Sequence, residues 1–128
     1  MHSLFTARRL YGYDFSDDCL RVFVERLWPR GVRKGSLRVD MWARGLAPSD
    51  ELRRWFSHDP AKWEEFKRRY YEELRVKEAL IRPLCEEAKR RGCAVLLYTA
   101  RDEQHNNAVA LAEYLENACG RSAALDPR

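Results

Sequence analysis

Two clusters of charged and hydrogen-bonding side chains each follow a short apolar run. Glu25 and Arg26 follow the first run, and Thr99 and Arg101 follow the second run much later in the chain. Because the carboxyl ends of neighbouring parallel strands meet at one edge of a sheet, we expect the two clusters to form one site. Guanidinium groups suit phosphate and carboxylate, so the combined cluster predicts recognition of an anionic ligand.

The candidate ligand-binding side chains form a cationic clamp and its surroundings. Arg26, Arg30 and Arg101 would hold the anion, and Trp28 would stack on an apolar or aromatic part of the ligand. We expect Asp102 to cap the last helix, whose N-terminus attracts anions through its free N–H groups. The predicted ligand-binding residues are Arg26, Trp28, Arg30, Thr99, Arg101 and Asp102.

Strand alternation predicts how the first cluster is oriented. Glu25 and Leu27 should point to one face of the strand, and Arg26 and Trp28 to the other. Charged groups on an otherwise apolar strand need partners. The alternative to a ligand site is therefore an internal pairing of the arginines with Glu25 and Asp102, which would only anchor the loops.

The candidate catalytic residues are His58, His105 and Glu25. Histidine titrates near neutral pH, so either imidazole would act as a general base if a carboxylate oriented it. A structural role for each histidine is the competing interpretation. The sequence has no Gly-rich phosphate loop, GxSxG elbow or HExxH motif, which excludes P-loop nucleotide hydrolases, common serine hydrolases and zincins.

The four cysteines show no metal-binding pattern, because no CxxC pair and no histidine at zinc-finger spacing is present. We therefore expect neither a metal nor another cofactor, and we expect buried thiols. The alternative is a disulfide between Cys93 and Cys119, since a strand starting at the first and a helix ending near the second would bring them to the same end of the sheet.

Composition is typical of one globular domain covering residues 1–128. The formal net charge is +4, and most of the 24 Lys and Arg residues are arginines, which is compatible with a phosphate or nucleic-acid partner or with solvated helix faces. No apolar run is long enough for a membrane span, so we expect a cytoplasmic protein without membrane contact. Abundant Arg and Glu beside few Gln and Asn favour a thermophilic source.

The order of predicted elements indicates an α/β fold. Residues 20–27 and 94–100 form apolar runs typical of buried strands, and residues 4–10 form a weaker strand. Ser49 and Asp59 each precede a helical pattern as N-caps. Strand, helices, strand and helix imply a parallel pairing with a helical crossover. We predict a small parallel sheet of about three strands with helices packed on it, a Rossmann-like layering.

The remaining segments are less regular. Residues 32–47 have no sustained period, so we expect an irregular segment that covers one edge of the core, anchored by Trp42. Pro83 should kink the third helical stretch or mark a fresh start. The last helix should face the sheet with its small and leucine side chains, and a frayed tail should follow residue 119.

Four ordered motifs resemble the YeaO-like family, domain of unknown function number 488. They are Glu-Arg-Leu-Trp-Pro-Arg-Gly, Leu-Ala-Pro-Ser-Asp-Glu-Leu-Arg-Arg-Trp-Phe, His-Asp-Pro with Trp63 and Phe66, and Leu-Tyr-Thr-Ala-Arg-Asp-Glu-Gln-His-Asn. The resemblance covers roughly residues 4–118 and implies a single intracellular α/β domain, but it supplies no reaction. The family usually has Asp at the position of Glu25 and Gly at the position of Ser57.

The leading hypothesis is a protein that binds a small phosphate-bearing or other anionic ligand at the C-terminal ends of the strands, with catalysis left open. A nucleic acid is the alternative partner, which would bind to a basic stripe with strong salt dependence. A structural or partner-binding domain is the third class. The sequence does not determine the oligomeric state.

Overall fold

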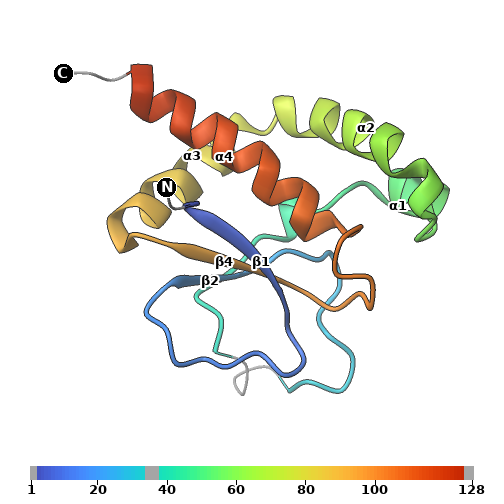
Figure 1. The fold of residues 1–128 in the computed structure, drawn as a ribbon, viewed down its shortest axis with the longest axis horizontal. Coiled ribbons are helices and arrows are strands. Elements are labelled where there is room, and N and C mark those ends of the chain that lie inside the picture. The colour runs from blue at the N-terminus through green and yellow to red at the C-terminus, as the bar shows by residue number, and fades with distance from the viewer. Residues whose placement is uncertain (1–2, 34–37, 126–128) are drawn as a thin grey trace.

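The computed structural model describes residues 3–33 and 38–125, with side chains up to Cys119. In chain order the elements are β1 Phe5–Arg9, β2 Leu20–Phe23, β3 Met41–Trp42, the 3-10 turn η1 Arg44–Leu46, α1 Asp50–Phe56, the 3-10 turn η2 Pro60–Lys62, α2 Trp63–Arg75, α3 Glu78–Arg91, β4 Ala94–Tyr98 and α4 Asn107–Leu125. Strands β1 to β3 come first, helices α1 to α3 follow, and β4 and α4 end the chain (Figure 1).

The four strands form one parallel sheet in the order β1-β4-β2-β3. Ala94 at the start of β4 lies between Phe5 of β1 and Leu20 of β2, so the three long strands begin at the same level. The predicted parallel pairing of the second and last strands is confirmed. The sheet has one strand more than predicted, because the two-residue β3 lies inside the segment expected to be irregular.

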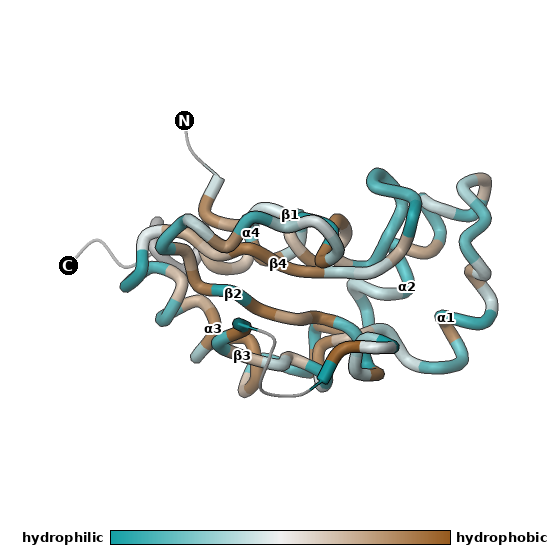
Figure 2. The backbone as a smooth tube through the Cα atoms, turned by 90° about the horizontal axis from the view of Figure 1, so that it is seen from below, coloured by the Kyte–Doolittle hydropathy of each residue, from teal (hydrophilic) through white to brown (hydrophobic). Residues whose placement is uncertain are grey.

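The two faces of the sheet are covered in different ways. Ala94, Leu96 and Tyr98 face the helices, whereas Val95 and Leu97 face the loops between the strands. Figure 1 shows all four helices on one side of the strands. Figure 2 shows that β4 is hydrophobic along most of its length, as expected for a central strand buried on both faces.

Two of the predicted helix starts are confirmed. The Ser49 side chain accepts a hydrogen bond from the backbone N–H of Leu52 at 3.1 Å, which caps α1. The Asp59 carboxylate accepts one from Ala61 at 3.0 Å at the start of η2. Both side chains satisfy backbone donors that a helix start otherwise leaves without partners. α3 runs through Pro83 as one element.

The last helix starts later than predicted. α4 begins at Asn107, and the side chain of Asn106 accepts a hydrogen bond from the backbone N–H of Val109 at 3.0 Å, so Asn106 is its cap. Asp102 instead accepts from the N–H groups of Gln104 and His105 in the turn before the helix. α4 continues to Leu125. Residues 126–128 lie outside the described residues, so the frayed tail stays a prediction.

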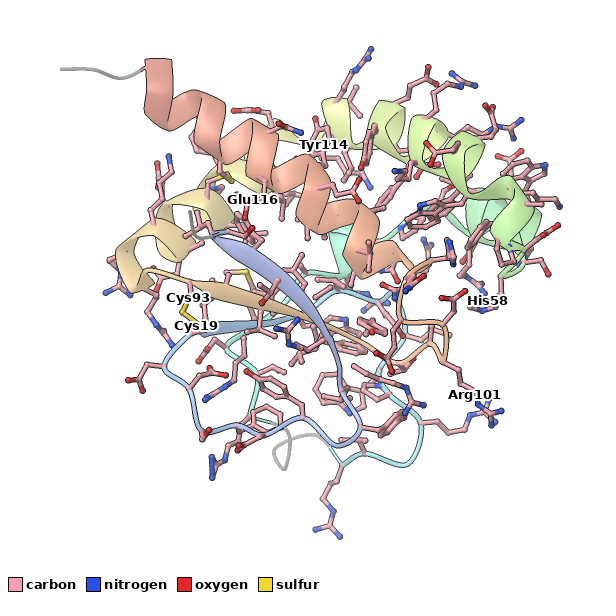
Figure 3. The ribbon with its side chains drawn as sticks, in the orientation of Figure 1. Cys19, His58, Cys93, Arg101, Tyr114 and Glu116 are labelled. Carbon is pink, nitrogen blue, oxygen red and sulfur yellow. A yellow bond between two sulfur atoms is a disulfide. The ribbon has the colours of Figure 1, made fainter. Side chains whose placement is uncertain are left out.

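The expectation of free buried thiols is wrong, and so is the pairing of Cys93 with Cys119. Cys19 is bonded to Cys93 and Cys85 to Cys119, with Cα–Cα distances of 4.8 and 5.4 Å. The first disulfide joins the N-terminal ends of β2 and β4 (Figure 3). The second joins α3 to α4. Cys93 and Cys119 do not meet. Cys19 and Cys93 stand directly before the neighbouring strands β2 and β4, so Cys93 lies closer to Cys19 than to Cys119 in the helix layer.

The segment from the end of β2 to β3 covers the loop face of the sheet. Trp42 of β3 donates a hydrogen bond from Nε1 to the carbonyl of Glu25 at 2.7 Å and packs against Phe23, in agreement with its predicted role as an anchor. Residues 34–37 of this segment lie outside the described residues.

The Gly31 turn has a positive φ of 79°, a conformation that glycine adopts without steric cost.

Candidate functional site

A cavity of about 260 Å³ lies at the C-terminal ends of β2 and β4, under the start of α1 and the start of α4. This is the edge at which open parallel sheets bind their ligands. In Figure 3 it lies on the His58 side of the molecule, opposite the Cys19–Cys93 disulfide. Its lining residues are Glu25, Arg26, Leu27, Ala47, Pro48, Arg53, Phe56, His58, Phe66, Thr99, Ala100, Asn106 and Asn107.

Glu25 and Thr99 connect the two strand ends that border the cavity. One oxygen of the Glu25 carboxylate accepts a hydrogen bond from the Thr99 backbone N–H, and the other accepts one from the Thr99 hydroxyl, both at 2.7 Å. A carboxylate oxygen accepts two hydrogen bonds when fully used. Each oxygen of Glu25 therefore keeps acceptor capacity for a further donor.

Two arginines, Arg26 and Arg53, line the mouth of the cavity. Arg26 and Arg53 both contact one carboxylate, Asp50, at 3.4 and 3.1 Å. The hydrogen bond from Arg53 lowers the pKa of Asp50, and the charges of Arg26 and Arg54 lower it further. Arg26 and Arg53 thus share the carboxylate of Asp50, and the cavity lining also contains the carboxylate of Glu25.

Aromatic side chains form the wall opposite the charged residues. Phe56 at the end of α1 and Phe66 of α2 stack with a centroid distance of 4.4 Å, and both line the cavity. The start of α4 closes a second side, because Asn107 donates a hydrogen bond to the carbonyl of Val24 at 2.9 Å. The cavity therefore combines an apolar wall with a few polar groups, the usual composition of small-molecule sites.

His58 reaches the cavity from an unusual backbone conformation. Ser57 and His58 have φ values of 48° and 56°, so two consecutive residues with side chains adopt the left-handed region. Such residues carry strain of about 1–2 kcal/mol each. The strained turn follows α1 directly and places His58 on the lining of the cavity.

His105 lies outside the cavity and has a carboxylate partner. Its Nδ1 is 2.9 Å from the carboxylate of Asp102, and its ring packs edge-on against Trp63. Backbone N–H groups, with that of Gln104 contributing most, and the hydrogen bond to His105 lower the pKa of Asp102. This pair fastens the turn before α4, which is the structural role that the sequence left as the alternative.

The structure brings four of the nine predicted site residues together. Glu25, Arg26, His58 and Thr99 line the cavity. The other five do not line it: Trp28, Arg30, Arg101, Asp102 and His105. Arg30 is an exposed turn residue, and Arg101 points away from the molecule in Figure 3 and has no ion pair with any residue the structure describes.

Trp28 lies on the other side of the sheet from Arg26, contrary to the prediction from strand alternation. Its ring packs against Phe23 and Trp42 with centroid distances of 5.8 and 5.1 Å, and its Nε1 donates to the carbonyl of Val32. Alternation holds only while a strand stays paired. β2 ends at Phe23, and the chain bends before Trp28, which reverses the side on which the later residues lie.

Sequence reasoning missed the partners that other elements supply. Asp50 and Arg53 come from the first turn of α1, and Phe56 comes from its end. The tandem Arg53–Arg54 after an acidic helix start was the available signal, but it also fits a solvated helix. Among residues 3–33 and 38–125, no group of three His, Cys, Asp or Glu side chains is arranged to hold a metal ion.

The fold and the cavity define a small parallel α/β protein with a ligand-type pocket at the C-terminal edge of its sheet. A family model described as the inactive DUF488-N3 subclade matches residues 4–127. The chain is 34% identical to the uncharacterized protein YeaO of Escherichia coli K12 over 110 residues, which are 86% of this chain and 95% of that protein. The chain therefore belongs to the YeaO-like DUF488 family.

Mycobacterial proteins match a shorter part of the chain. The uncharacterized protein Rv3073c of Mycobacterium tuberculosis H37Rv is 47% identical over 72 residues, which are 56% of this chain and 61% of that protein. The uncharacterized protein Mb3100c of Mycobacterium bovis shows the same identity and coverage. The match thus spans about three fifths of the length of these relatives. No solved structure matches the chain significantly.

Proposed function

We propose that this protein binds a small phosphate-bearing or other anionic ligand in the cavity at the ends of β2 and β4. The observation that carries the proposal is the shared contact of Arg26 and Arg53 with the single carboxylate of Asp50 at the cavity mouth. Two guanidinium groups that share one partner carboxylate keep further N–H donors for a bound anion. A phosphate has the geometry to accept hydrogen bonds from both.

The clamp differs from the one that the sequence predicted. Arg26 is retained, Arg53 takes the place expected for Arg30 and Arg101, and the aromatic wall is Phe56 rather than Trp28. Among the described residues, Glu25 is bound by Thr99 and Asp102 by His105, whereas Arg26 and Arg53 pair with the carboxylate of Asp50. A ligand would therefore compete with Asp50 for these two arginines.

Binding without turnover is the form of the proposal that the family supports. The matching family model is described as inactive. His58 is the one predicted general base that lines the cavity, and the carboxylates of Asp50 and Asp59 are held by Arg53 and by a backbone N–H respectively. We assign His58 a binding role, in which its ring lies over the ligand.

None of the helices that the structure describes is both long enough and hydrophobic enough to span a membrane. The cytoplasmic location, the thermophilic source and a nucleic-acid partner stay predictions from the sequence. A nucleic-acid partner would give affinity that falls steeply with salt concentration, whereas a ligand held inside the cavity would depend less on salt.

The test is calorimetric titration of the purified protein with inorganic phosphate and with small phosphate esters. We expect saturable binding that weakens at least tenfold in Arg26→Ala and in Arg53→Ala, because each variant loses a charge-assisted hydrogen bond. Arg30→Ala and Arg101→Ala are the matched controls, since they remove the same charge outside the cavity and should bind as the wild type does.

Two results would contradict the proposal. Equal loss of affinity in all four arginine variants would show that only the net charge matters. Binding confined to oligonucleotides at low salt would favour a nucleic-acid partner. Unfolding midpoints of each variant, measured in urea, separate a loss of binding from a loss of folding.

A further inference from the structure

Glu25 lines the cavity, and its two hydrogen bonds from Thr99 leave acceptor positions on the carboxylate that a ligand can use. The Thr99 N–H and hydroxyl each occupy one of its oxygens, and both hydrogen bonds come from the β4 side. Because Glu25 lines the cavity, its remaining acceptor positions are available to a ligand there. Two adjacent oxygens that still accept hydrogen bonds are complementary to a molecule that carries two neighbouring donors.

A pair of hydroxyl groups on adjacent carbon atoms fits this acceptor pair. A carboxylate accepts one hydrogen bond on each oxygen from such a diol, and hydrogen bonds to a charged acceptor are stronger than those between neutral groups. In open α/β sheets, a carboxylate near the C-terminal end of a strand is a common acceptor for ribose hydroxyls. Glu25 stands two residues after the end of β2.

The phosphate of such a ligand would lie at the mouth. Arg26 directly follows Glu25 in the chain, and Arg53 shares the Asp50 partner of Arg26. The groups that would bind the diol and the phosphate therefore lie in the same cavity. The sequence has no Gly-rich loop to hold a pyrophosphate on backbone N–H groups. Recognition by two side chains suits a single phosphate.

The size of the cavity agrees with a ligand of this kind. The cavity volume of about 260 Å³ lies just below the range of about 300–1,000 Å³ typical of small-molecule sites, so it suits a small ligand such as a pentose phosphate. A base attached to the sugar would extend toward the aromatic wall of Phe56 and the open mouth.

We propose that the cavity recognises a ribosyl phosphate, with Glu25 accepting the 2- and 3-hydroxyls of the ribose and with Arg26 and Arg53 holding the 5-phosphate. This inference rests on the proposed anion-binding function and names its ligand class. Two kinds of ligand carry both the ribose diol and the 5-phosphate: a free pentose phosphate and a ribonucleoside monophosphate.

The experiment compares ligands that differ by one hydroxyl. Ribose 5-phosphate and 2-deoxyribose 5-phosphate are titrated into the full chain by calorimetry, with inorganic phosphate as the anion alone. We expect the deoxy compound to bind at least tenfold more weakly. In Glu25→Gln the difference should shrink to about twofold, while inorganic phosphate binds at least as tightly as in the wild type, because the arginines are unchanged and one negative charge is removed from the cavity.

A matched carboxylate controls for the loss of charge. Glu73 accepts hydrogen bonds from the Ser49 N–H at 2.9 Å and from the Ser49 hydroxyl at 2.6 Å, the same arrangement as Glu25 with Thr99, but it does not line the cavity. Glu73→Gln should therefore keep the full preference for ribose. If Glu25→Gln does not fold, the ribose-to-deoxyribose ratio of the wild type decides the question alone.

The outcomes separate this inference from the proposed function. Equal affinity of wild type for the ribose and deoxyribose compounds overturns the diol assignment, whereas Arg26-dependent phosphate binding would still support an anion site. Absence of binding by every phosphate compound overturns both. Adenosine and deoxyadenosine monophosphates distinguish the source: tighter binding of the ribonucleotide than of ribose 5-phosphate supports a nucleotide, and weaker binding supports a free sugar phosphate.

Discussion

The carboxylate of Glu25 accepts both the backbone N–H and the hydroxyl of Thr99, at 2.7 Å each, across a sequence separation of 74 residues. These two hydrogen bonds fix the ends of β2 and β4 next to each other, beyond the last paired residues of the strands. The position of the cavity floor therefore depends on a side chain and not on the sheet ladder alone.

Thr99→Val should destabilise the protein by about 1–2 kcal/mol. The change keeps the shape of the side chain but removes the hydroxyl donor, so a part-buried charged oxygen of Glu25 loses one partner. Thr99→Ser keeps the hydroxyl and should cost less. Urea unfolding monitored by tryptophan fluorescence measures both. A larger cost for Ser than for Val would show that the methyl group, not the hydrogen bond, is responsible.

Ser57→Gly should stabilise the protein by about 0.5–1 kcal/mol. Ser57 has a φ of 48°, which strains a residue with a side chain by about 1–2 kcal/mol, and glycine loses part of this gain through its larger unfolded-state entropy. Ser57→Ala keeps the strain and serves as the control, so a similar gain in Ala would contradict the explanation.

Each disulfide should stabilise the fold by up to about 4 kcal/mol in the chain-entropy treatment, because the bonds close loops with sequence separations of 74 and 34 residues. Cys19→Ala with Cys93→Ala removes one bond, and Cys85→Ala with Cys119→Ala removes the other. We expect a lower urea midpoint in each double variant under oxidising conditions. With a reducing agent present, wild type and variants should differ much less.

Non-reducing peptide mapping checks the pairing itself. It should recover Cys19 linked to Cys93 and Cys85 linked to Cys119. Recovery of a peptide that links Cys93 to Cys119 would contradict the structure and restore the pairing that the sequence suggested.

Acid should weaken the protein partly through Glu65. Hydrogen bonds from Arg68 and Arg69 lower the pKa of Glu65 to about 2, below its ordinary value. Because the folded-state pKa is depressed, the stabilisation is present above the unfolded pKa of about 4.3 and is lost as pH falls toward 2. Glu65→Gln should therefore reduce the slope of unfolding free energy against pH in this window.

The control for the acid effect is Glu86→Gln. Glu86 is an exposed glutamate without an ion pair to any residue in the described part of the chain. Its substitution should leave the pH dependence of unfolding unchanged. Identical slopes for Glu65→Gln and wild type would show that the surface pair contributes nothing measurable, as happens for many exposed pairs.

Asp50→Asn should tighten the binding of inorganic phosphate about two- to fivefold if the proposed site is right. The carboxylate of Asp50 competes with the ligand for Arg26 and Arg53, and exposed ion pairs of this kind have modest energies. Asp14→Asn removes the same charge from an exposed loop position and should not change affinity. Calorimetric titration at two salt concentrations measures both, and weaker binding in Asp50→Asn would contradict the competition.

Local sequence signals were sufficient for the elements that local physics controls. Ser49 and Asp59 cap helices as predicted, since a side-chain oxygen next to free N–H groups needs no distant partner. The apolar run that became β4 is buried on both faces, as its composition required. The parallel pairing of β2 with β4 follows from the order of the elements, and it brought Glu25, Arg26 and Thr99 to one cavity.

Tertiary structure decided everything that depends on where a chain bends or which elements meet. Trp28 lies on the loop face because pairing ends at Phe23, and alternation has no meaning beyond a paired strand. Arg53 replaces Arg101 at the cavity because α1 brings Arg53 to the lining, whereas the side chain of Arg101 points away from the molecule. Disulfide partners follow the same rule: a covalent bond needs Cα atoms within a few ångströms, and only the packed layers determine which cysteines reach that distance.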